Sequence, residues 1–293
     1  MTSTATSELD PASGLRALDV RPLIVASHPR SGTHLVIDSF RRQFEECRSW
    51  KWPTEPVDRL YLNLDSLIAQ PRPRIGERAA LRILRRARRP LIKTHCLPGF
   101  ANWFRTQQVR ELAPDWRAWL ERSAEACYVL RDGRAVMCSY HAFTRGFEPE
   151  ADVPLGTFLR QQRQGVSRVR AWAQHVRAWL AEPGVHVVRF EDLVREPEST
   201  LEKTAERFGV AFRRAVPLLP RKVGGSLEYR ASQLLGVRPA SSAIRGRLDR
   251  DRQPRWQELF DADDRDFFQG EAGELLIELG YESSGDWVAG SAI

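Results

Sequence analysis

Four short apolar segments, each about as long as a buried strand, recur along the chain. They are residues 23–27 (LIVAS), 90–94 (PLIKT), 126–131 (ACYVLR) and 185–190 (VHVVRF). Their apolar residues are continuous rather than alternating with polar ones, which is typical of strands that are covered on both faces.

Segments with helical spacing separate these strands. The first strand is followed by Leu35, Val36, Phe40 and Phe44, and the third and fourth are separated by Val166, Val169, Trp172, Val176 and Trp179. Apolar residues at 267–279, stopped by Gly280, predict a closing helix. Because strands joined by long helical connections need crossovers, the pattern predicts an α/β fold with one central parallel sheet flanked by helices.

The same pattern suggests a single domain at residues 21–285 with short flanking segments. Residues 1–20 lack periodicity and are expected to form a flexible arm, and residues 286–293 a C-terminal tail. Residues 213–256 are rich in Arg, Gly, Pro and Ser without strong periodicity. A loop of this length in a compact domain is often functional, so we expect it to cover the substrate or cofactor.

Composition adds a basic charge to this picture. The chain has 293 residues, 28% charged and 42% hydrophobic, and a net charge of +7 that comes almost wholly from arginine. Guanidinium groups suit phosphate and sulfate partners because their planar fork matches oxyanions; a solvated basic surface is the alternative. With no signal peptide, no apolar run near the ~20 residues of a membrane span, and four scattered cysteines, we expect a cytoplasmic location.

Residues 29–34 (PRSGTH) lie between the first strand and the first helix. A turn of this kind can form a P-loop-like anion cradle, because backbone N–H groups and the helix dipole both favour negative charge there. Ser31 and Thr33 could add hydroxyl donors, and Arg30 a cation. The segment is not a Walker A loop, since the G-x4-G-K-[ST] pattern is missing.

Two further polar segments follow strands. Lys93-Thr94-His95 ends the second strand, and residues from Arg131 to Ser139 follow the third. Ligands of open parallel sheets bind at the carboxyl ends of strands. A neutral His95 could take a proton from a hydroxyl near pH 7, or be an ordinary loop histidine; Arg131 and Ser139 could grip a phosphate, or Arg131 could pair with a carboxylate. Together the three strand ends indicate a nucleotide with several anionic groups.

In this order the segments resemble those of the cytosolic-type sulfotransferases, which use 3′-phosphoadenosine-5′-phosphosulfate (PAPS). The resemblance extends from about Leu23 to Tyr281. It implies that the cofactor is held by Arg30, Ser31, Gly32, Thr33 and His34 at its 5′-phosphosulfate. Residues 128–143 (YVLRDGRAVMCSYHAF) resemble the signature for the 3′-phosphate, with Arg131 and Ser139 in the binding positions.

Other segments fit the family with two departures. The stretch Trp172-x-x-His175-Val176-x-x-Trp179 matches, and we interpret His175 and both tryptophans as core packing. Leu35 stands where the family commonly has a tryptophan that stacks on adenine. The family also has an Arg-Lys-Gly segment in its late loop, followed closely by Gly and Trp, whereas here Arg245-Gly246-Arg247 stands alone and Trp256 comes later. Arg245 and Gly246 are carried over as cofactor-binding residues, and Arg247 is added on chemical grounds alone.

The resemblance implies in-line displacement at sulfur without a metal. His95 would be the base, Lys93 and Arg30 would stabilise developing charge, and the product would be adenosine 3′,5′-bisphosphate (PAP). A Mg-dependent nucleotide kinase or NTPase-like enzyme, and a non-catalytic nucleotide-binding module, are the alternatives.

The acceptor is left open as a small-molecule, carbohydrate or lipid hydroxyl. Trp50-Lys51-Trp52 and residues 60–67 are candidates to line its pocket, with core packing as the alternative. We expect no nucleic-acid partner, and a homodimer is left open.

Overall fold

A five-stranded parallel sheet forms the centre of the protein. The computed structural model describes residues 18–52, 55, 57–67, 75–99, 116–146, 148–220 and 255–289. In sheet order the strands are β2 (Leu62–Asn63), β3 (Leu91–Thr94), β1 (Leu23–Ala26), β4 (Glu125–Leu130) and β7 (His186–Arg189). All neighbouring pairs are parallel, so every carboxyl end lies at one edge. The predicted α/β fold with a central parallel sheet is confirmed.

The apolar pattern located four of these strands to within one residue at each end. It missed β2, which is too short to show a period. It also placed Val166 in a helix, and this is wrong: Val166 belongs to β6 (Val166–Ser167), which pairs antiparallel with β5 (Gln162–Arg163). The helix begins only at Arg168, because the Ser167 hydroxyl caps it by accepting a hydrogen bond from the Arg170 N–H.

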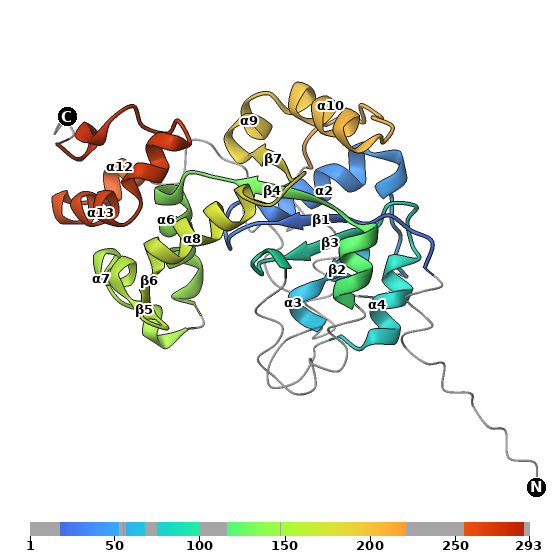
Figure 1. Ribbon diagram of the computed structural model, residues 1–293, viewed down its shortest axis with the longest axis horizontal. Helices are drawn as coiled ribbons and strands as arrows, with labels where there is room; N and C mark the ends of the chain where they lie inside the picture. The colour runs from blue at the N-terminus through green and yellow to red at the C-terminus, as the bar shows by residue number, and fades with distance from the viewer. Residues whose placement is uncertain are drawn as a thin grey trace, which may run out of the picture.

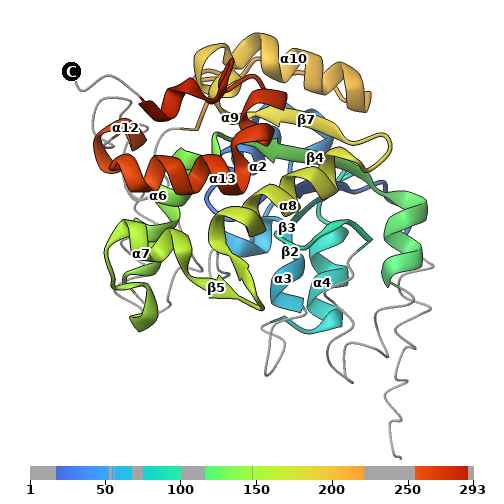
Figure 2. The same cartoon turned by 60° about the vertical axis from the view of Figure 1, so that its left-hand side comes forward.

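Helices cover both faces of the sheet (Figures 1 and 2). One face carries α2 (Thr33–Gln43), α9 (Phe190–Arg195) and α10 (Pro197–Phe208), and the other carries α4 (Glu77–Leu84) and α8 (Arg168–Leu180). The helix α13 (Ala262–Glu278) packs against α8. Successive strand residues point to opposite faces. Leu23 and Val25 therefore pack with Phe40, whereas Ile24 and Ala26 belong to the core cluster on the other face.

Shorter elements connect these layers. They are η1 (Glu45–Cys47), η2 (Val57–Leu60), α3 (Leu64–Leu67), η4 (Pro149–Ala151), α7 (Leu155–Arg160), α12 (Trp256–Leu259) and η6 (Gly285–Ala289). The helix α6 (Gly133–Thr144) follows β4 and carries residues of the predicted cofactor site. None of the described helices is long and apolar enough to cross a membrane.

The C-terminal elements are attached through the buried side chain of Arg134 at the start of α6. Its Nη2 lies 2.8 Å from Asp132 Oδ2, and its Nη1 pairs with Glu282. The guanidinium lies between two indole rings, 3.9 Å from the Trp256 ring centroid and 4.7 Å from that of Trp287. Because a buried cation is stable only when paired, these contacts fix the C-terminal segment against the turn that follows β4.

Candidate active site

The turn after β1 has the backbone of an anion cradle. Arg30 and Gly32 both have left-handed backbones, with φ of 73° and 99°. Gly32 caps α2 without a side-chain hydrogen bond, so the first N–H groups of the helix remain available to an anion. A Cβ on Gly32 would lie 2.4 Å from Cδ2 of Phe190, so both the backbone conformation and the neighbouring ring require glycine here.

The side chains that follow Arg30 in the cradle are mostly buried. Ser31 and Thr33 are buried, and Thr33 Oγ1 lies 2.6 Å from Ser27 Oγ. Leu35 is 3% exposed and belongs to the core cluster under α2. Leu35 therefore does not replace the family tryptophan as a stacking surface for adenine.

Arg30, Arg131 and Ser139 meet beside the cradle, although they come from three separate segments. Arg30 Nε donates to Ser139 Oγ at 3.3 Å, and Arg131 Nη1 donates to the Arg30 carbonyl at 3.1 Å. The two guanidinium groups each lie 4.4 Å from an aromatic ring centroid, Arg30 over Phe143 and Arg131 over Phe190. In Figure 1, α6, which carries Ser139, lies on the side of the sheet toward which the β1 arrow points, and Arg30 follows β1.

Neither of these two cations forms a salt bridge within the part of the chain that the structure describes. No described carboxylate lies within 4.0 Å of Arg30 or Arg131, so Arg131 does not form the helix-entry salt bridge that was its alternative interpretation. Burial lowers the pKa of Arg131, and the more distant charges of Glu191 and Asp132 oppose this shift. Burial, and then the charge of Arg131, lower the pKa of Arg30. Partly desolvated cations without a salt-bridge partner favour an anionic ligand.

His95 lies at the end of β3 with its ring orientation fixed. Its Nδ1 lies 2.7 Å from the Ser27 carbonyl, to which it must donate, so the neutral ring carries its lone pair on Nε2. Burial, and next the positive charge of Lys93, lower the pKa of His95 to about 4. The imidazole is therefore neutral near pH 7 and able to accept a proton.

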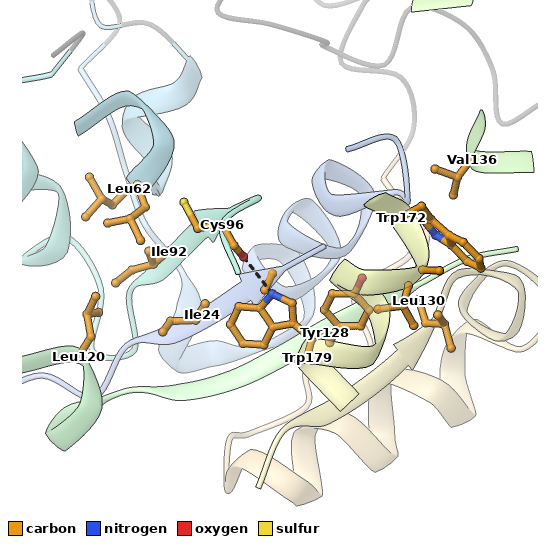
Figure 3. Packing of buried hydrophobic residues seen from close by; sticks show 14 of the residues in the cluster. Ile24, Leu62, Ile92, Cys96, Leu120, Tyr128, Leu130, Val136, Trp172 and Trp179 are labelled. Carbon is orange, nitrogen blue, oxygen red and sulfur yellow. Dashed lines mark hydrogen bonds between the residues drawn. The ribbon is translucent and has the colours of Figure 1, made fainter. Parts of the chain in front are cut away.

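Buried side chains of α8 and β4 support the His95 loop through hydrogen bonds. His175 Nε2 donates to the His95 carbonyl at 3.1 Å, and Trp179 Nε1 donates to the Cys96 carbonyl at 2.9 Å, a bond drawn in Figure 3. The Tyr128 hydroxyl lies 3.0 Å from His175 Nδ1. His175, Trp172 and Trp179 are buried as predicted.

Asp65 in α3 is a site residue that the sequence did not reveal. Its Oδ2 lies 3.2 Å from Lys93 Nζ, and its Oδ1 accepts from Thr94 Oγ1 and from the His95 N–H, both at 3.0 Å. The sequence offered one weak signal, an acid within residues 60–67. The pairing of Asn63 with Lys93 in the sheet brings this acid to the site.

His34, which the sequence placed in the cofactor set, lies in the first turn of α2. Burial, followed by the charges of Lys93, His95 and Arg30, lowers the pKa of His34 to about 3. The ring therefore lies among the groups of the site and is neutral near pH 7.

Several predicted residues are not part of this cluster. Trp50 and Trp52 are 53% and 61% exposed, and the described ring contacts of Trp50 are with Trp52 and Arg86. Arg245, Gly246 and Arg247 lie outside the described residues. Among the residues described, no group of three or more His, Cys, Asp or Glu side chains could hold a metal ion.

The fold and the cluster together define an α/β protein in which partly buried cations and a neutral histidine meet at the carboxyl ends of the parallel strands. The sulfotransferase domain family matches residues 21–219, more than half of the chain. The protein belongs to this family, and the predicted sulfotransferase and its class of enzyme are confirmed.

Several solved sulfotransferase structures are similar to this chain. No curated protein matches it. Mouse sulfotransferase SULT7A1 complexed with PAP is 15% identical, with 98% of this chain and 95% of that chain covered and a TM-score of 0.48. Retinol dehydratase in complex with androsterone and inactive cofactor PAP is 14% identical, with coverages of 92% and 81% and a TM-score of 0.48. Sulfotransferase STF9 from Mycobacterium avium is 13% identical, with coverages of 90% and 78% and a TM-score of 0.44.

Proposed function

We propose that this protein transfers the sulfuryl group of PAPS to an acceptor hydroxyl, with His95 as the base. The observation that carries the proposal is the meeting of Arg30, Arg131 and Ser139 beside a cradle whose neighbouring strand ends in Lys93 and His95. In this proposal, one edge of the sheet would hold two anionic groups and carry the proton acceptor.

The nucleotide would occupy both anion sites at once. The N–H groups at the start of α2, together with Ser31, Thr33 and His34, would surround the 5′-phosphosulfate. Arg131 and Ser139 would hold the 3′-phosphate, since a guanidinium and a hydroxyl can donate to the same oxyanion. The Ser139 oxygen already accepts from Arg30, so its hydroxyl proton would be donated to a phosphate oxygen.

The reaction is a single displacement at sulfur. The acceptor oxygen forms a bond to sulfur while the bond from sulfur to the 5′-phosphate oxygen breaks, and His95 Nε2 takes the acceptor proton. PAP leaves with the bonding electrons as added negative charge on its 5′-phosphate. Lys93 and Arg30 stabilise this charge where it develops, which lowers the barrier rather than only strengthening binding.

The donor also strengthens the base. The pKa of His95 is low because of burial and of the nearby Lys93 charge. A bound phosphosulfate brings negative charge to the same place, which favours the imidazolium and raises this pKa toward neutrality. His95 would therefore become an effective base when the donor is bound.

The remaining parts of the proposal concern coverage, acceptor and location. Residues 213–256 would cover the cofactor, with Arg245 and Gly246 at the 3′-phosphate and Arg247 added by its charge. The acceptor would be a hydroxyl of a small molecule, carbohydrate or lipid. A cytoplasmic location is supported by the four free cysteines.

Transfer of label from radiolabelled PAPS to a panel of phenols, alcohols, sterols and sugars in EDTA tests this function. We expect a labelled product and equimolar PAP. Transfer that is lost in EDTA and restored by Mg²⁺ would favour the nucleotide kinase alternative. Tight PAP binding without transfer to any acceptor would favour a non-catalytic module.

A further inference from the structure

Asp65 binds a run of consecutive residues at the end of β3. One oxygen, Oδ2, lies 3.2 Å from Lys93 Nζ. The other, Oδ1, accepts from the Thr94 hydroxyl and the His95 N–H at 3.0 Å, and lies 3.7 Å from Cys96 Sγ. The two groups that the reaction needs from this strand are therefore linked to the same carboxylate.

A carboxylate at this position is electrostatically unfavourable for binding an anionic donor. It lies in a site built to bind an anionic donor, so its charge opposes donor binding. Burial raises the pKa of Asp65, but the charges of Lys93 and His95 and its bonds to the His95 N–H and Thr94 hydroxyl outweigh this and lower the pKa overall. Asp65 is therefore ionised, and its charge attracts the Lys93 ammonium in a way that a neutral amide would not.

We propose that Asp65 is the positioning residue that holds the Lys93 ammonium and the His95 imidazole in their reactive arrangement. This inference rests on the proposed function. Asp65 Oδ2 holds the Lys93 ammonium in place, and Asp65 Oδ1 holds the main chain at His95. The imidazole can then donate from Nδ1 to the Ser27 carbonyl, which leaves Nε2 as the acceptor of the substrate proton.

The arrangement differs from a Ser-His-Asp triad, in which the acid contacts the imidazole directly. Here the Ser27 carbonyl receives the ring N–H, and the carboxylate acts on His95 through the main chain. Its charge also stabilises the imidazolium that forms when the acceptor loses its proton.

Asp65 is the acid among the described residues whose charge acts on His95. These titratable groups come from β3, α3, α8, the turn after β1 and α2, and are Lys93, Asp65, His175, His28 and His34. Removing the Asp65 charge leaves a cation and neutral imidazoles around His95. Protonation of His95 should then require a more acidic solution.

The variant Asp65→Asn tests this role, with Asp38→Asn as its matched control. Asp38 is a half-buried acid in α2 that pairs with Arg41 at 3.3 Å. Among the described residues it forms no hydrogen bond to Lys93 or His95. In Asp65→Asn the single-turnover rate with radiolabelled PAPS and 4-nitrophenol should fall about 100-fold, the usual cost of misplaced reacting groups. Its affinity for PAP should be unchanged or stronger, because a negative charge has left the anion site.

The pH dependence of the transfer rate distinguishes a positioning role of Asp65 from a role in folding stability alone. In Asp65→Asn the acid limb of the PAPS-bound rate should move to lower pH, and Asp65→Glu, which keeps the charge, should restore it in part. Asp38→Asn should keep both the wild-type rate and the wild-type profile. A rate for Asp65→Asn within about threefold of wild type, or equal losses of rate, PAP affinity and thermal stability, would overturn the proposal.

A measurement without turnover tests the positioning role of Asp65 separately from the proposed function. Nitrogen-resolved NMR of the six histidines should show a protected Nδ1–H for His95, identified by its loss in His95→Gln. This signal should persist in Asp38→Asn and disappear or exchange rapidly in Asp65→Asn. If wild type transfers no label to any acceptor of the panel, the proposed function fails. A ring signal that persists in Asp65→Asn would independently overturn the positioning role.

Discussion

Arg131 lies over the Phe190 ring and donates to the Arg30 carbonyl, and no described carboxylate lies within 4.0 Å of it. Arg30 itself is a non-glycine residue with φ of 73°, a conformation that costs about 1 kcal/mol or more and usually persists only where the surroundings require it. Both arginines are thus held by neighbours rather than by their own preferences, as expected of residues that await a ligand.

Arg131→Ala should remove the preference of the protein for a 3′-phosphate. The wild type should bind PAP much more tightly than 5′-AMP, because charge-assisted hydrogen bonds contribute about 1.5–3 kcal/mol each, or roughly 10- to 150-fold in affinity. In Arg131→Ala the PAP affinity should fall by such a factor while 5′-AMP binding changes little. Titration calorimetry of both nucleotides measures this difference.

Arg177→Ala is the matched control, since Arg177 is an exposed arginine of α8 that pairs with Glu278. It should leave both affinities near wild type. Equal binding of PAP and 5′-AMP by the wild-type protein would contradict the assignment of Arg131 to the 3′-phosphate.

At the scale of elements, α8 supports the loop that carries His95. The indole of Trp179 stacks against Tyr128, with ring centroids 6.0 Å apart, and donates to the Cys96 carbonyl (Figure 3). Because this hydrogen bond is buried, it fixes the main chain at Cys96, the residue directly after His95.

Trp179→Phe should therefore loosen the loop and slow transfer. The variant keeps an aromatic ring but leaves the Cys96 carbonyl without its indole donor, which costs about 1–3 kcal/mol of folding stability. We expect a lower thermal midpoint and a slower single-turnover rate, measured by calorimetry and by release of labelled product.

Trp172→Phe removes the same atoms from a neighbouring tryptophan of α8. The Trp172 Nε1 has no hydrogen-bond partner among the described residues, so this variant loses ring size alone. If both variants slow transfer equally, the indole bond to Cys96 does not position the loop.

Elements with their own apolar pattern could be predicted from the sequence, and the contacts between elements could not. The strands, α2 and the cradle after β1 follow from local residues, and the parallel order brings the strand ends together. Asp65 was missed because its partner Lys93 lies 28 positions away and joins it through the two-residue strand β2. The Arg134 contacts with Trp256 and Trp287 are equally long-range and have no local signal.

At the scale of the whole molecule, four buried or half-buried histidines gather at one edge of the sheet. Burial is the main cause that lowers the pKa of each, and the group comprises His28, His34, His95 and His175. In the unfolded chain each would take up a proton near its ordinary pKa of 6.5. The native protein keeps them neutral to lower pH, so acid favours the unfolded state.

The free energy of unfolding should therefore fall as the solution is acidified below about pH 6.5. Each histidine that stays neutral in the native state contributes a slope of about 1.4 kcal/mol per pH unit, which ends where its native pKa is reached. For His95 and His175 that end is about 4. Urea denaturation at a series of pH values measures the slope.

His175→Gln, whose side chain does not titrate, should reduce this slope by one histidine's share. A free energy of unfolding that is constant from about pH 7 to about pH 5 would contradict the burial of neutral imidazoles at this edge.

The claim that His95 is the base of a PAPS-dependent transfer is tested most directly by two measurements on His95→Ala. Single-turnover transfer from radiolabelled PAPS should fall by about 10²–10⁴-fold, the usual contribution of general-base catalysis. PAP affinity should remain within about threefold of wild type, since the 3′-phosphate and cradle contacts are untouched. Transfer by His95→Ala within about tenfold of wild type would show that another group removes the proton.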